Sequence, residues 1–179
     1  RDLHSFPTRR SSDLWQSLVR PHALYSNRDN GELIQMKKVI FIGNIGSGKT
    51  TLSQAILGDE LEYKKTQSVE VLGNGILDTP GEYLELNHYR GALMITSADA
   101  EVIAFVQSAI DNQKMFPPGY GGSFAKTVIG VVTKTDVASE QEIADAEHFL
   151  KMAGAKKIFK VSSYDGTGIK EVADFLQDE

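Results

Sequence analysis

The stretch Gly43-Asn44-Ile45-Gly46-Ser47-Gly48-Lys49-Thr50 satisfies the pattern G-x-x-x-x-G-K-S/T at every fixed position. The apolar run 39–42 precedes it and favours a strand, and residues 51–57, which follow, favour a helix. A glycine-rich turn between a strand and a helix points successive backbone N–H groups at an anion, and the helix N-terminus adds partial positive charge. The stretch therefore predicts an α/β fold with a site for a phosphate chain.

Two side chains of this stretch have expected roles in binding a nucleoside triphosphate. Lys49 would reach the β- and γ-phosphates and the Thr50 hydroxyl would hold Mg²⁺, so the predicted cofactors are Mg²⁺ with GTP or ATP. The competing interpretation is a glycine-rich turn with an incidental Lys-Thr pair, which the flanking strand and helix disfavour. The predicted nucleotide-contacting residues of this segment are Gly43, Asn44, Ile45, Gly46, Ser47, Gly48, Lys49, Thr50 and Thr51.

The composition is that of a globular protein. With 41% hydrophobic and 24% charged residues among 179, the chain is long enough to bury one substantial core. It contains no cysteine, which excludes disulfides and thiolate metal sites and suits a reducing cytosol. No apolar stretch approaches the roughly 20 residues of a membrane span, and the net charge of −5 argues against nonspecific nucleic-acid binding. We therefore expect a cytoplasmic protein that binds neither nucleic acid nor membrane.

Residues 1–35 differ from the rest of the chain. They show no sustained strand or helix period, and they contain Pro7, Pro21 and scattered serines. The string 4–14 resembles the in-frame translation of a common sequencing-adapter oligonucleotide, and Met36, followed by two lysines and an apolar run, resembles a start. We therefore expect residues 1–35 to be a disordered, non-native extension. The competing interpretation is a disordered regulatory arm.

From residue 36 onward, strand and helix patterns alternate, which predicts one domain over 36–179 with a mostly parallel sheet and helices on both faces. Ser139 and Glu142 form a capping-box pattern at the start of one helix. Residues 116–122 contain two prolines and three glycines and are expected to be irregular. The expected strands are 37–42, 69–72, 76–77, 102–106, 128–132 and 158–161. The expected helices are 50–57, a stretch within 83–97, 139–152 and 169–176.

Three polar segments follow predicted strands, where open α/β sheets bind their ligands. In the segment 78–81, Asp78 could hold Mg²⁺ and the Gly81 N–H could bond a γ-phosphate oxygen. In 133–136, the Asp136 carboxylate could accept two hydrogen bonds from a guanine edge while the Lys134 stem lies over the base. The segment 162–166 could close over the base from the other side. The first and third segments could also be plain polar turns, because Asp, Ser, Pro and Gly are common in turns. The second could instead mark the start of a helix, where Asp and Thr are common.

The order and spacing of these segments resemble the Ras-like small GTPase superfamily of P-loop proteins. The resemblance implies that Thr66 coordinates Mg²⁺ with Thr50 and Asp78, and that Lys49, Thr66, Gly81 and Glu82 surround the reacting phosphate. It also implies that the second and third segments bind the base, through Thr133, Lys134, Asp136, Ser162 and Ser163. Glu82 stands where Ras-type enzymes carry a water-orienting Gln, and a carboxylate there repels a γ-phosphate, so slow hydrolysis is expected.

A narrower resemblance covers nearly all of 36–179. The combination of K-K-T-Q, D-T-P-G-E-Y, A-D-A-E-V-I, F-P-P-G and V-I-G-V-V-T-K is similar to the ethanolamine/propanediol-utilisation P-loop family (EutP/PduV). The resemblance implies a role in bacterial catabolism of ethanolamine or propanediol, in association with microcompartments. It further implies that microcompartment shell or enzyme proteins are the partners besides nucleotide.

Three functions remain open from the sequence. The first is a GTP-binding protein with slow hydrolysis that acts as a switch or assembly factor. The second is an ATP-dependent phosphotransferase acting on a small acceptor such as acetate, in which Glu82 and the loop 116–123 would shape the acceptor site. The third is a scaffold in which bound nucleotide is structural.

Overall fold

The computed structural model describes residues 25–26, 33–34, 36–58, 70–72, 75–81 and 90–177. Thr66 and Glu82, for which the sequence predicts roles beside the γ-phosphate, lie outside these residues. Within residues 1–35, two-residue strands β1 (Tyr25–Ser26) and β2 (Leu33–Ile34) pair antiparallel. None of the described helices is long and apolar enough to cross a membrane.

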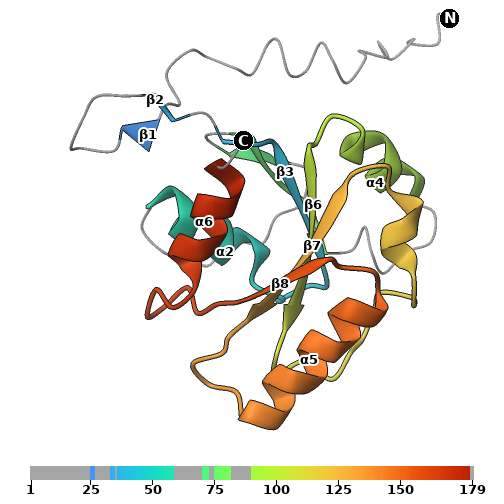
Figure 1. The fold of residues 1–179 in the computed structure, drawn as a ribbon, viewed down its shortest axis with the longest axis vertical. Coiled ribbons are helices and arrows are strands. Elements are labelled where there is room, and N and C mark those ends of the chain that lie inside the picture. Colours follow the sequence, from blue (N-terminus) through green and yellow to red (C-terminus); the bar gives the residue numbers. More distant parts are fainter. Residues whose placement is uncertain are drawn as a thin grey trace, which may run out of the picture.

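A six-stranded sheet with the order β4-β5-β3-β6-β7-β8 forms the centre of the described domain (Figure 1). The four pairings β5–β3, β3–β6, β6–β7 and β7–β8 are parallel, whereas β4 pairs antiparallel with β5. The central strands are continuous apolar runs because both of their faces are covered. The strand bounds are β3 Val39–Gly43, β4 Glu70–Leu72, β5 Ile76–Asp78, β6 Val102–Ser108, β7 Thr127–Thr133 and β8 Lys157–Lys160.

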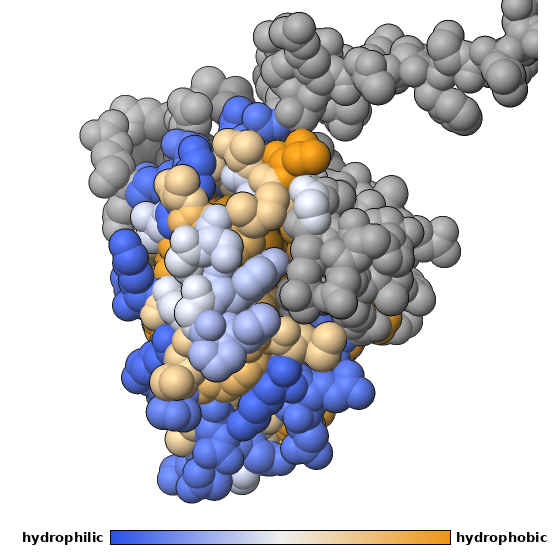
Figure 2. Space-filling view, turned by 90° about the vertical axis from the view of Figure 1, so that its right-hand side faces the viewer, coloured by the Kyte–Doolittle hydropathy of each residue, from blue (hydrophilic) through white to orange (hydrophobic). Residues whose placement is uncertain are grey.

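Helices cover both faces of this sheet, which confirms the predicted layers (Figure 1). On one face, α2 (Lys49–Leu57) and α6 (Ile169–Gln177) bury Leu52 and Leu176. On the other face, α4 (Arg90–Ser97) and α5 (Glu140–Met152) bury Leu93 and Leu150. Hydrophilic side chains gather on the lower part of this second side, at the height of α5 (Figure 2). Two separate apolar layers therefore hold the sheet in place.

The predicted capping box is confirmed and fixes the start of α5. Ser139 accepts a hydrogen bond from the Glu142 backbone, and the Glu142 carboxylate accepts one from the Ser139 backbone. The prediction that 116–122 is irregular is wrong at its end, because a short 3₁₀-helix, η3, covers Tyr120–Ser123. Gly119, at φ 73°, turns the chain into this single tight turn after the two prolines.

Candidate nucleotide-binding site

The carboxyl ends of the parallel strands bring the predicted site residues to one edge of the sheet. Gly43 ends β3, Asp78 ends β5 and Thr133 ends β7, while Ser162 follows β8 after one further residue. Neighbouring parallel strands end at the same edge, so residues that are far apart in sequence meet there. This edge is where open α/β sheets bind their ligands.

The phosphate loop, residues 43–50, makes a left-handed turn between β3 and α2. Gly46 and Gly48 have φ angles of 74° and 92°, a region that only glycine enters without strain. The Lys49 ammonium donates to the carbonyls of Gly43 at 2.9 Å and Asn44 at 2.8 Å, and the residue is only 6% exposed. These two carbonyls hold the Lys49 ammonium group within the loop, where it could also contact a bound anion.

The underside of the phosphate loop is closely packed against the sheet. A Cβ atom on Gly43 would lie 2.3 Å from the Val106 carbonyl oxygen and 2.6 Å from the Ser47 Oγ, so only glycine fits there. The Ser47 Oγ is buried and finds no hydrogen-bond partner among the described residues. The close packing at Gly43 therefore fixes the position of the loop against β6.

Thr50 and Asp78, two of the three predicted Mg²⁺ ligands, lie in direct contact. The Thr50 hydroxyl donates to an Asp78 carboxylate oxygen at 2.6 Å, which links the first turn of α2 to the end of β5. Mg²⁺ in nucleotide sites takes one or two protein oxygens and completes its shell with phosphates and water. The described residues contain no group of three or more His, Cys, Asp or Glu side chains that could hold a metal by themselves. The Thr50–Asp78 pair therefore fits a Mg²⁺ that is bound together with a triphosphate.

The turn 78–81 packs against the phosphate loop. The Thr79 hydroxyl donates to the Phe41 carbonyl at 2.6 Å, which ties the turn to β3. A Cβ atom on Gly81 would lie 2.4 Å from the backbone nitrogen of Ile45 and 2.6 Å from its Cα. Gly81 is thus required for the close approach of two backbones.

The two predicted base-binding segments are joined to each other and to the phosphate loop. The Thr133 hydroxyl donates to the Ser47 carbonyl at 2.6 Å, so the end of β7 supports the phosphate loop directly. Thr135 N–H donates to the Val161 carbonyl at 3.3 Å, which connects this segment to the end of β8. Between these contacts, Lys134 has a left-handed φ of 60°, the one described non-glycine residue with positive φ. Asp136 follows it and is exposed.

The third segment forms a compact turn after β8. Ser162 is buried, and its N–H donates to the Thr167 carbonyl at 2.9 Å. Ser163 is half-buried beside it, as is Thr51 in the first turn of α2. The predicted phosphate-loop, metal and base residues that the structure describes therefore converge at one site.

One group of residues at this site was not predicted. The Asn44 side-chain amide donates to the Gln113 Oε1 at 3.0 Å and to the Asp111 carboxylate at 3.3 Å, while its oxygen accepts from the Ile45 N–H. The connection 109–126 between β6 and β7 carries these partners and contains no α-helix. Its length was a signal, because structureless connections longer than about 12–15 residues are often functional.

The phosphotransferase hypothesis placed Glu82 and the loop 116–123 beside an acceptor. Glu82 lies outside the described residues, and the loop 116–123 packs against α5 and the core. Phe116 and Phe124 are buried, and the Gly121 N–H donates to the Ala153 carbonyl at 2.7 Å. The polar segment 109–115, which precedes it, is the part that contacts the phosphate loop.

Comparisons with known proteins agree with this geometry. The chain is 42% identical to the propanediol utilization protein PduV of Citrobacter freundii over 141 residues, or 79% of this chain and 93% of that protein. It is 32% identical over 142 residues to proteins of Escherichia coli and Salmonella typhimurium named probable acetate kinase EutP, covering 79% of this chain and 89% of each.

A solved structure supports the fold alone. Translation elongation factor SelB from Methanococcus maripaludis, in complex with the GTP analogue GppNHp, superposes with a TM-score of 0.59 at 22% identity. The match covers 79% of this chain but about a third (33%) of that one, so the shared part is a single domain of a longer protein. The architecture is thus that of the P-loop nucleoside triphosphatases.

The family model described as ethanolamine utilisation – propanediol utilisation matches residues 36–178, which span the whole described sheet and its helices. With that match and the identities to its members, the chain belongs to the PduV–EutP family.

Proposed function

We propose that this protein binds Mg²⁺ and GTP, hydrolyses GTP slowly, and acts as a nucleotide-dependent switch in ethanolamine or propanediol catabolism. The observation that carries the proposal is the convergence of Lys49, Thr50 and Asp78 on one closely packed phosphate loop. The family relationship supports the pathway, and the GTPase-like fold supports the type of ligand.

The chain's own residues account for triphosphate binding. The N–H groups of the loop and of the first turn of α2 would bond to the phosphates, and Lys49 would neutralise the charge that develops on the γ-phosphoryl group. A Mg²⁺ ion held beside Thr50 and Asp78 would supply positive charge that offsets the charge of the phosphates. Thr50 and Asp78 would orient that ion, and Gly81 would offer its N–H to the γ-phosphate.

The preference for guanine rests on Asp136. An exposed carboxylate at the end of β7 can accept two hydrogen bonds from the N1–H and N2–H₂ groups of guanine, which adenine does not offer. The Ser163 N–H would bond the guanine oxygen. The Thr135 N–H donates to the Val161 carbonyl at 3.3 Å, and this link between the two segments supports the proposed base site.

The proposed switch depends on the segments on either side of the γ-phosphate. Thr66 and Glu82, both outside the described residues, are the side chains through which the proposed switch would respond to the γ-phosphate. Microcompartment shell or enzyme proteins are the proposed partners of the protein, which would be cytoplasmic or associated with the microcompartment. This part of the proposal rests on the family.

Calorimetric titration of the full chain with GTP and with ATP, both with Mg²⁺, tests the proposal. GTP should bind more tightly than ATP, and Asp136→Ala should weaken GTP binding while ATP binding stays the same. Lys49→Ala should remove most binding of either nucleotide, with circular dichroism confirming that the variant is folded. Undiminished nucleotide binding by the Lys49 variant would show that the loop is not the site.

A second candidate function is transfer of the γ-phosphoryl group from ATP to acetate. Two observations favour this activity. Relatives at 32% identity are named probable acetate kinase. In addition, the polar side chains of Asp111 and Gln113 accept hydrogen bonds from Asn44 of the phosphate loop. An acetate oxygen would form a bond to the γ-phosphorus as the bond to the β-phosphate oxygen breaks, giving acetyl phosphate and ADP. Nucleotide turnover that requires acetate, without GTP binding, would replace the switch by this activity.

A third outcome is a scaffold without turnover. Nucleotide that remains bound through purification, and that is not hydrolysed or transferred even with partner proteins present, would favour that function over both others.

A further inference from the structure

Asn44 lies in the phosphate loop at a position that the pattern G-x-x-x-x-G-K-S/T leaves open, yet the residue is only 6% exposed. Its amide nitrogen donates to the Gln113 Oε1 at 3.0 Å and to the Asp111 Oδ2 at 3.3 Å. Its amide oxygen accepts the Ile45 N–H at 2.8 Å. A carboxylate only accepts and a backbone N–H only donates, so these partners fix which way the amide points. Both amide hydrogens are therefore used inside the protein, and the side chain needs no ligand to satisfy them.

The turn 108–113, which supplies both acceptors, is held in shape by hydrogen bonds of its own. The Gln113 N–H donates to the Asp111 Oδ1 at 2.9 Å, and the Asp111 N–H donates to the Ser108 carbonyl at 3.2 Å. Gln107, near the end of β6, is 3% exposed, and its side-chain amide donates to three carbonyls of the turn. These are the carbonyls of Ser108 at 3.1 Å and of Asp111 and Gln113 at 3.4 Å. The turn is thus fixed to β6 independently of the phosphate loop.

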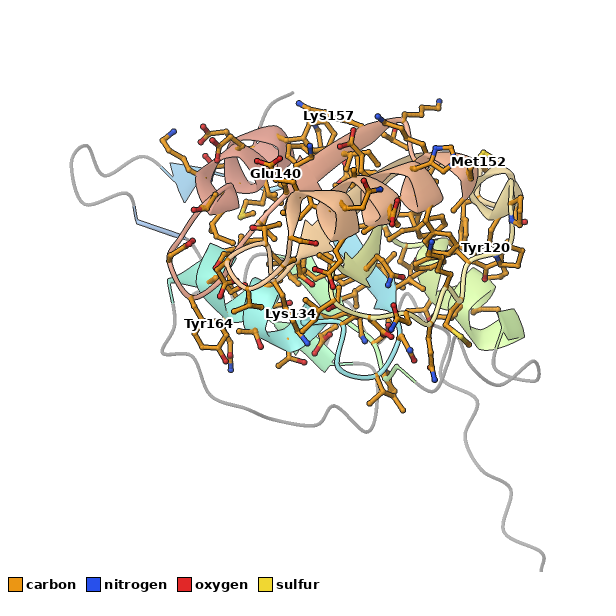
Figure 3. The ribbon with its side chains drawn as sticks, turned by 90° about the horizontal axis from the view of Figure 1, so that it is seen from below. Tyr120, Lys134, Glu140, Met152, Lys157 and Tyr164 are labelled. Atoms are coloured by element: carbon orange, nitrogen blue, oxygen red, sulfur yellow. The ribbon has the colours of Figure 1, made fainter. Side chains whose placement is uncertain are left out.

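The rest of the connection between β6 and β7 goes to another part of the fold. The Gly119 N–H donates to the carbonyl of Met152, at the end of α5, at 2.8 Å. Figure 3 shows Tyr120 beside Met152 and away from Lys134, which follows β7 at the edge where the strands end. The turn 108–113 is therefore the part of this connection that is placed to act on the phosphate loop.

Asn44 also contacts the lysine on which the proposed function depends. The Lys49 ammonium donates to the Asn44 carbonyl at 2.8 Å, so a shift of Asn44 moves one of the oxygens that hold this cation. We propose that Asn44 is a positioning residue, whose amide, held by the turn 108–113, fixes the loop and with it the Lys49 ammonium for triphosphate binding. The proposal rests on the proposed nucleotide binding and adds a support from outside the shared motif. A loop that is already held in place costs less free energy to order when the ligand binds.

The main test is calorimetric titration of the full chain with GTP and with inorganic triphosphate, both with Mg²⁺. Asn44→Asp keeps the size of the side chain and the bond from Ile45, but it places a carboxylate where the amide now donates to Asp111. Binding of both ligands should weaken by about tenfold or more, because the loop would contact the phosphates and not the base. The double variant Asn44→Asp/Asp111→Asn reverses the direction of the same hydrogen bond. It should regain most of the lost affinity, which a role in packing alone would not predict.

Three single variants complete the test. Asp111→Asn alone should not bind more tightly than the wild type, as it would if removal of a negative charge were enough to raise the affinity. Asn112→Asp adds the same charge at the exposed neighbouring residue and should leave binding within about twofold of the wild type. Gln113→Ala removes the other acceptor from outside the phosphate loop and should weaken binding of both ligands by about threefold.

The outcomes separate this proposal from the proposed function. A wild type that binds neither GTP nor triphosphate contradicts nucleotide binding itself. A wild type that binds GTP, with an Asn44→Asp variant that binds it equally well, overturns the positioning role alone. A double variant as weak as Asn44→Asp would also overturn it, because the loss would then not come from the bond to Asp111. If Asn44→Asp does not fold, Gln113→Ala decides the question, and unchanged binding by that variant overturns the proposal.

Discussion

Replacing Thr133 by valine tests whether the end of β7 supports the phosphate loop. The Thr133 hydroxyl donates to the Ser47 carbonyl at 2.6 Å, and Thr133 is 3% exposed. Valine keeps the shape but leaves that buried carbonyl without its side-chain donor, which costs about 1–3 kcal/mol. The Thr133 side chain lies against Gly48, where a Cβ atom would be 3.4 Å from its oxygen, so a methyl group fills the same space and opens no cavity.

We therefore expect Thr133→Val to lower the free energy of unfolding of the nucleotide-free protein by about 1–3 kcal/mol. Urea titration followed by far-UV circular dichroism measures this loss. Nucleotide affinity should fall as well, because part of the binding free energy would then be used to order the phosphate loop.

Two further variants isolate the hydrogen bond. Thr133→Ser keeps the donor and should retain most of the stability. Thr127→Val makes the same exchange at the exposed start of β7 and should change stability by no more than about 0.5 kcal/mol. Equal urea midpoints for Thr133→Val and Thr127→Val would refute the supporting role of this bond.

Three other substitutions test separate parts of the fold. Gly81→Ala places a Cβ atom 2.4 Å from a phosphate-loop nitrogen. The free energy of unfolding, measured by urea titration, should fall by about 1–3 kcal/mol, and GTP binding should weaken. Gly122→Ala, whose Cβ atom would have nothing within 4 Å, should change neither quantity. Ser139→Ala removes the capping box and should cost about 1 kcal/mol; an unchanged thermal midpoint would contradict this. Hydrogen bonds from Lys151 and Lys160 lower the pKa of the Glu147 carboxyl from 4.5 to about 2. The charged form of Glu147 therefore stabilises the folded state above pH 4.5, and this stabilisation is lost as the pH falls toward 2. The stability difference between wild type and Glu147→Gln should accordingly shrink between pH 6 and pH 3, and a constant difference would exclude the ion pairs as its cause.

Much of the site could be predicted from the sequence because the carboxyl ends of parallel strands lie at one edge of a sheet. Asp78, Thr133 and Ser162 each follow an apolar run, and parallel strands end at one edge, so the sequence indicated that they would meet. The lengths of two elements were less predictable. The helix expected within 83–97 is described only from residue 90, and η3 forms in a segment rich in proline and glycine, because a single 3₁₀ turn needs no periodic pattern.

The contacts of Asn44 with Asp111 and Gln113 could not be predicted, for a physical reason that bears on function. They join two irregular segments, and side-chain hydrogen bonds between loops leave no period in the sequence. The phosphate loop is common to hydrolases and phosphotransferases, since both hold the γ-phosphoryl group with the same N–H groups, lysine and metal. What separates hydrolysis from transfer must therefore lie in the residues around the loop. The 109–115 segment is the described part of those surroundings that touches the loop without belonging to the shared motifs, and it is there that variants should alter the choice between water and another acceptor.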